Sequence, residues 1–148
     1  MSANYSLLAI PAHWFISVVP HAYAMRLIKG ATNGRWNNAN PTGSAWKTEM
    51  QRSVPADVLA QFERAEAAHR NGFENLPLFA AAVLSGHVAG LDRGTLDTHA
   101  AAYLALRVLF TVLYINTSKL KTSYLRSLVW TAGVGICISL FVQAGLKA

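Results

Sequence analysis

Apolar residues gather in four long runs, and polar residues gather in the connections between them. Each run has the roughly 17 to 25 residues that a helix needs to cross the hydrocarbon core of a membrane. We therefore expect an all-α integral membrane protein, a four-helix bundle formed by one domain over residues 1–148. The expected spans are about residues 5–28, 74–91, 95–116 and 124–146.

The connections between these runs differ sharply in length. Residues 91–97 and 116–123 are short, whereas residues 29–61 form a long polar loop that glycine and proline interrupt. Trp36 and Trp46 in this loop are expected to anchor it at the membrane interface. Pro55 suits the first position of a helix, and the sequence after it reads as a continuous helix into the second span. That helix should project beyond the membrane.

Composition and charge support this reading. Hydrophobic residues make up 53% of the chain and charged residues 14%, whereas about 25% are charged in a typical soluble domain. The net charge is +6, but the basic residues flank apolar runs, which favours a lipid bilayer as partner and not nucleic acid. Both basic connections should lie on the cytoplasmic side. Cys137 is the only cysteine and the histidines lack ligand spacing, so we expect no metal site.

Two charged residues stand out against the apolar runs. Glu74 lies where the second run begins, and Arg107 lies about halfway along the third. Such charges are costly in a membrane unless they are paired, and they often mark function. One interpretation is an ion pair between them that fixes helix register. Another is a site for an anionic ligand, positioned by Asn71 and Glu74 and completed by Tyr114 and Arg126; both interpretations can hold together.

The stretch ERAEAAHRNGFENLPLF, residues 63–79, resembles a motif of the membrane-associated proteins in eicosanoid and glutathione metabolism, the MAPEG family. That family has an E-R pair, a few residues, then R-A-x-x-N-x-x-E and an apolar run that is aromatic or contains proline. The third span resembles it through Arg107 and Tyr114, and the fourth through Arg126 and Ser127. The resemblance covers nearly the whole chain and points to the microsomal glutathione transferases.

The resemblance implies a homotrimer in which glutathione, as co-substrate, lies between adjacent subunits near the cytoplasmic face. It implies catalytic roles for Arg126, which would stabilise the glutathione thiolate, and for Tyr114. The lipophilic substrate would be an electrophile dissolved in the bilayer, and the membrane would be the endoplasmic reticulum if the chain is eukaryotic. The implied glutathione-binding residues are Arg70, Asn71, Glu74, Arg107 and Ser127.

The chain departs from the family pattern at several positions. Ala67 replaces an arginine, and Phe110, at a position that is aromatic or histidine in the family, cannot donate a hydrogen bond. The third connection is longer, so Lys121 is an alternative to Arg126. Three functions stay open. The first is a glutathione-dependent transferase or peroxidase. The second is a glutathione-independent isomerase or cyclase of a hydrophobic metabolite, and the third is a non-enzymatic, lipid-presenting membrane protein.

Overall fold

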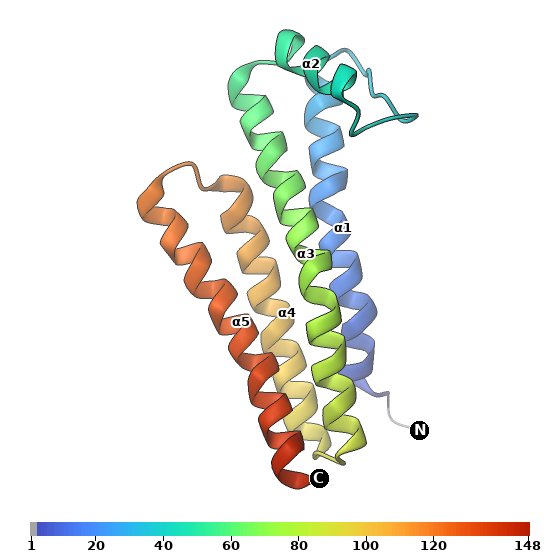
Figure 1. The fold of residues 1–148 in the computed structure, drawn as a ribbon, viewed down its shortest axis with the longest axis vertical. Helices are drawn as coiled ribbons and strands as arrows, with labels where there is room; N and C mark the ends of the chain where they lie inside the picture. Colours follow the sequence, from blue (N-terminus) through green and yellow to red (C-terminus); the bar gives the residue numbers. More distant parts are fainter. Residues whose placement is uncertain (1–2) are drawn as a thin grey trace.

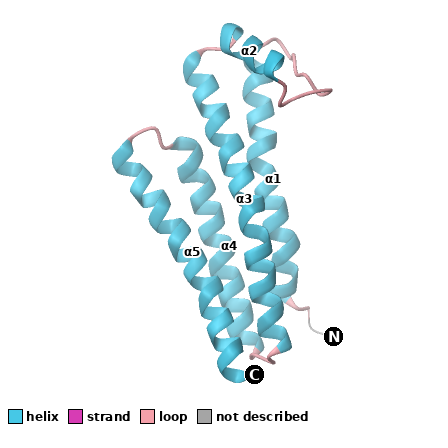
Figure 2. Cartoon of the chain, viewed as in Figure 1, coloured by secondary structure: helices cyan, strands magenta, loops and turns pink. Residues whose placement is uncertain are grey.

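The computed structural model describes residues 3–148, and its regular structure in that part is entirely helical (Figure 2). The all-α class expected from the sequence is therefore confirmed. Four of the helices are long and one is short. In chain order the helices are α1 (Tyr5–Ala31), α2 (Ser44–Ser53), α3 (Ala56–Val88), α4 (Arg93–Asn116) and α5 (Leu120–Lys147).

The four long helices run alongside one another, and α3 packs against α1, α4 and α5 (Figure 1). Helix α1 begins and α5 ends at one end of the molecule, whereas α2 lies at the opposite end. The connection between α4 and α5 is also at the α2 end. Both basic connections therefore lie at the same end of the molecule, as the charge pattern requires.

Three helices of the described chain, α1, α4 and α5, are long and apolar enough to cross a membrane. Helix α3 does not meet the same criterion, because Asn71, Glu74 and His87 interrupt its apolar half. Its boundary also differs from the expected span of residues 74–91. The helix ends at Val88, since Gly90 has a φ of +68°, which favours glycine, and its N–H donates to His87 O at 3.0 Å. The fourth expected span also begins early, at Leu120.

The expectation of a long loop over residues 29–61 is partly wrong, because these residues contain helix α2. Trp46 and Met50 are four residues apart and share one face of this helix. Both are buried with Ile28 and Val54, so Trp46 is a core residue and not an interface anchor. This small second cluster fixes α2 over the adjoining ends of α1 and α3.

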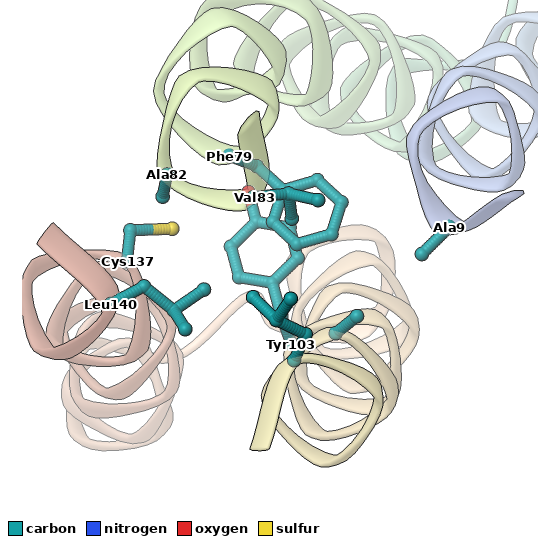
Figure 3. Packing of buried hydrophobic residues seen from close by; sticks show 9 residues of the cluster. Ala9, Phe79, Ala82, Val83, Tyr103, Cys137 and Leu140 are labelled. Carbon is teal, nitrogen blue, oxygen red and sulfur yellow. The ribbon is translucent and has the colours of Figure 1, made fainter. Parts of the chain in front are cut away.

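The main core lies between the long helices, away from α2. Phe79 of α3 stacks on Tyr103 of α4, with ring centres 4.1 Å apart and an interplanar angle of 4° (Figure 3). Ala82 and Cys137 lie beside this pair, and their small side chains let α3 and α5 approach closely. The stacked rings therefore hold the middle of the molecule together.

The turn between α3 and α4 ends in a helix cap. The Asp92 carboxylate accepts hydrogen bonds from the hydroxyl and from the backbone N–H of Thr95, the latter at 2.9 Å. Because these bonds favour the ionised form, they lower the pKa of Asp92, the hydroxyl being the larger cause. The cap satisfies backbone donors that the first turn of α4 would otherwise leave unpaired.

Candidate functional site

Arg107 is held at the interface of α3 and α4. Its side chain is buried, with 4% of the residue's surface exposed, and its Nη2 donates to Asn71 Oδ1 at 2.9 Å. The guanidinium also lies over the ring of Phe110, 4.6 Å from its centre. The side chain of Asn75 lies next to this contact, where its Nδ2 donates to the backbone oxygen of Asn71 at 2.8 Å. A buried cation therefore meets an amide and an aromatic ring at this interface.

The expected ion pair between Glu74 and Arg107 is wrong. Within residues 3–148 no ion pair joins them, and Glu74 is exposed. The reason is helical geometry: Glu74 lies about 60° around α3 from Asn71, which turns it away from α4. Arg64, by contrast, is two turns before Asn71 on the same face, and its Nε donates to Ile115 O at 2.9 Å.

Arg126 and Tyr114 lie together where α4 and α5 meet at the α2 end. The guanidinium carbon of Arg126 lies 4.1 Å from the centre of the Tyr114 ring, a cation–π geometry. Both side chains are partly exposed. Ser127 is exposed on α5, and its hydroxyl donates to Ser123 O at 3.3 Å. The alternative cation, Lys121, lies exposed in the first turn of α5.

The seven candidate residues thus fall into three groups within one chain. Asn71 and Arg107 meet between α3 and α4, and Tyr114 and Arg126 meet between α4 and α5, with Ser127 beside them. Arg70 and Glu74 are exposed on another part of the α3 surface. A single chain therefore does not gather all seven around one ligand.

The sequence of the chain matches a known protein family over most of its length. The model of the MAPEG family matches residues 6–146, nearly the whole chain. The chain belongs to the MAPEG family. It is a membrane protein of a family associated with eicosanoid and glutathione metabolism, which includes glutathione transferases and related enzymes. No curated protein and no solved structure gave a significant match.

Two buried polar residues of this MAPEG protein were not singled out by the sequence. His13 and Tyr103 are buried with ring centres 5.2 Å apart, and neither ring nitrogen of His13 nor the Tyr103 hydroxyl has a hydrogen-bond partner in the described structure. His13, Ser17 and His21 recur every four residues along α1. That spacing predicts one polar face on the helix and could have drawn attention to them.

The same face of α1 continues into a polar contact with α3. His21 Nδ1 lies 2.7 Å from Glu66 Oε1, and His69 Nδ1 donates to Ser17 O at 2.8 Å. Just beyond lies a cavity of about 420 Å³ between α1, α2, α3 and the loop before α2. Its lining comprises His21, Trp36, Pro41, Thr42, Lys47, Met50, Gln51, Leu59, Phe62, Glu63, Glu66 and Arg70.

Proposed function

We propose that this MAPEG protein is a membrane-bound glutathione-dependent transferase or peroxidase that acts on lipophilic electrophiles. The observation that carries the proposal is the placement of the Arg126 guanidinium over the Tyr114 ring. A guanidinium beside a thiol lowers the pKa of that thiol from about 8.5, which increases the thiolate fraction at neutral pH. The cation stays accessible because the ring supports it without neutralising its charge.

The chemistry of glutathione suits the exposed groups. The peptide carries two carboxylates, which arginines bind well, and one ammonium group, which a carboxylate can accept. Arg70 supplies a cation for a carboxylate and Glu74 supplies the carboxylate for the ammonium group, whereas Arg126 is assigned to the thiol. In the transferase reaction the sulfur forms a bond to the electrophilic carbon, and the leaving group departs with the bonding electrons. In a peroxidase reaction the thiolate would take one oxygen of the hydroperoxide, which breaks the O–O bond and releases the alcohol, and a second glutathione thiol would then attack the resulting sulfenic acid to give the disulfide and water.

We further propose that the site forms between subunits of a homotrimer. Arg70 and Glu74 are exposed on α3, whereas Arg126 lies across the molecule on α5, and no contact joins the two sets within the described chain. A neighbouring subunit can bring its α5 to this surface. Tyr124, Leu125 and Leu128 on α5 are exposed apolar side chains, 68%, 49% and 65% exposed respectively, which supports contact with a neighbour or with lipid.

The membrane arrangement belongs to the same proposal. Helices α1, α4 and α5 would cross the bilayer with the apolar half of α3 as a fourth span, and the α2 end would face the cytoplasm. The apolar half of α3 lies alongside the three apolar helices, so it would lie in the bilayer with them. An electrophile could then reach the site directly from the bilayer.

Substitution of Arg126 tests the proposed chemistry. Arg126→Ala should lower the turnover of glutathione with a lipophilic electrophile by about a hundredfold, because it removes stabilisation of the developing anion. Glutathione binding, measured by calorimetry, should change little, since that interaction grows in the transition state. Lys121→Ala is the matched control, because it removes a cation of the same helix that lies away from Tyr114, and it should keep full turnover.

Glu74→Gln should instead weaken glutathione binding, by about ten- to a hundredfold if one charge-assisted bond is lost. If the wild-type protein binds no glutathione, yet Arg126→Ala abolishes activity on another hydrophobic substrate, the glutathione-independent isomerase or cyclase replaces this proposal. Full activity in both Arg126→Ala and Glu74→Gln would show that the site assignment is wrong.

A further inference from the structure

The cavity between α1, α2 and α3 has the size and the walls of a small-ligand site. Its volume, about 420 Å³, falls within the roughly 300–1,000 Å³ of ligand pockets. Trp36 and Phe62 form an aromatic part of the wall, with ring centres 6.5 Å apart, and Met50 and Leu59 add apolar surface. The cavity adjoins α1 and α2, whereas Arg107 lies at the α4 interface, so the buried arginine does not line it.

Both signs of charge line this cavity without pairing across it. Lys47 and Arg70 are cations and Glu63 is an anion, yet none of the three forms an ion pair in the described structure. Glu66, the fourth charged residue, is held by His21 at 2.7 Å. Opposite charges that surround one space and remain unpaired are complementary to a ligand that carries both charges. A ligand with a single charge would meet attraction and repulsion together.

We propose that this cavity binds a small zwitterion, an ammonium group joined to an anionic group. The ammonium would be accepted by Glu63 and Glu66 beside the faces of Trp36 and Phe62, which attract cations. Lys47, with Arg70, would bind the anionic group. A phospholipid headgroup and a free zwitterionic metabolite share this chemistry. The inference does not depend on the use of glutathione, although Arg70 belongs to both proposed sites.

Glycerophosphoethanolamine is a suitable probe, titrated into the purified full chain in a maltoside detergent that lacks phosphocholine. Binding should give a saturable change in tryptophan fluorescence, and Trp36→Phe should remove most of it. Ethanolamine alone and glycerol 3-phosphate alone should bind about tenfold more weakly, because each engages only one sign of charge. Fluorescence from Trp36 reports binding without any catalytic turnover.

Lys47→Met and Glu63→Gln should each weaken binding about three- to fivefold, as expected for exposed charge pairs. Arg52→Met on α2 and Asp57→Asn on α3 are matched controls, because these exposed charges do not line the cavity, and both should bind as the wild type does. Circular dichroism confirms that every variant is folded. Equal binding by the lining variants and the controls would overturn the proposal, as would the absence of saturable binding.

A short-chain lipid, dihexanoyl phosphatidylethanolamine below its micelle concentration, distinguishes the two sources. Tighter binding than that of the headgroup alone identifies a lipid, and equal binding identifies a free zwitterion; either outcome supports the site. Glutathione should compete with the probe, because Arg70 belongs to both proposed sites, whereas Arg126→Ala should leave binding of the probe unchanged. Weaker binding of the probe by Arg126→Ala would show that the cavity is part of the glutathione site and would overturn the proposal. Full activity of Arg126→Ala would count against the proposed enzyme function only, since binding of the probe in this cavity needs no turnover.

Discussion

Removal of the Asn71 side chain should destabilise the protein more than removal of the Arg107 charge, to which Asn71 is hydrogen-bonded. Asn71→Ala deletes the acceptor that lies 2.9 Å from Arg107 Nη2. Arginine stays charged in proteins even when it is buried, so the almost fully buried guanidinium would keep its charge and lose its partner. A hydrogen bond to a charged group contributes about 1.5–3 kcal/mol, and an orphaned buried group adds its own desolvation cost. We therefore expect Asn71→Ala to lower the free energy of unfolding by about 2–3 kcal/mol.

Arg107→Met provides the contrast. It keeps a long apolar side chain over Phe110 but removes the charge that needs a partner. Asn71 Oδ1 then still accepts a hydrogen bond from Asn75 Nδ2, at 3.3 Å. The free energy of unfolding should change by less than about 1 kcal/mol, because replacing a buried charge by an apolar group is often neutral or stabilising. In the Arg107→Met background, adding Asn71→Ala should lower the free energy of unfolding only slightly further.

The assay is a double-mutant cycle on unfolding in detergent micelles, followed by circular dichroism. The coupling free energy between the two positions should be about 1.5–2 kcal/mol. Asn116→Ala is the matched control, because this exposed asparagine on α4 donates only to Val112 O within its own helix. Additive effects, or equal losses from Asn71→Ala and Asn116→Ala, would refute the reasoning that Asn71 supports a buried cation.

Four further predictions concern other parts of the molecule. Tyr103→Phe removes a buried hydroxyl without a partner and keeps the stacked ring, so the free energy of unfolding should rise or stay within about 1 kcal/mol of the wild type; a loss above about 2 kcal/mol in detergent unfolding would reveal a buried hydrogen bond. Gly72→Ala should lower stability by about 1–3 kcal/mol, since the new Cβ would lie 3.1 Å from the α1 backbone, whereas Gly135→Ala meets no atom within 4 Å and should stabilise its helix. The hydrogen bonds that lower the pKa of Asp92 stabilise the protein above the ordinary carboxyl pKa, and this stabilisation is lost as the pH falls through the lowered pKa; Asp92→Asn should therefore flatten the decline in stability below about pH 5, and an unchanged pH profile contradicts this. In sealed vesicles with the cytoplasmic face outward, protease should cleave residues 29–61 and spare the C-terminus, and the reverse pattern would contradict the proposed topology.

The four long helices could be predicted from the sequence because each contains a long apolar run. The start of α3 followed from Pro55, and its continuity followed from the absence of a break before the apolar half. Helix α2 was missed because the loop around it is polar, although Trp46 and Met50 have helical spacing. Whether those two residues face lipid or a core depends on which helices lie beneath them, and only the tertiary structure supplies that.

The candidate site was predicted less well than the fold. The structure brings Tyr114 and Arg126 into contact, whereas the ion pair expected between Glu74 and Arg107 does not form in the described residues. A sequence gives the angle of each residue around its helix, but it does not give the rotation of that helix against its neighbours. Between Asn71 and Glu74, about 60° decides which side chain meets Arg107.

That rotation also explains how one stretch of α3 serves two environments. Asn71 follows Arg70 by one residue, which is about 100° around the helix, so the two side chains leave α3 in different directions. Asn71 meets the buried cation of α4, and Arg70 lines the cavity beside α1 and α2. A membrane protein with few charges therefore separates a structural polar contact from an exposed binding surface by helix geometry alone.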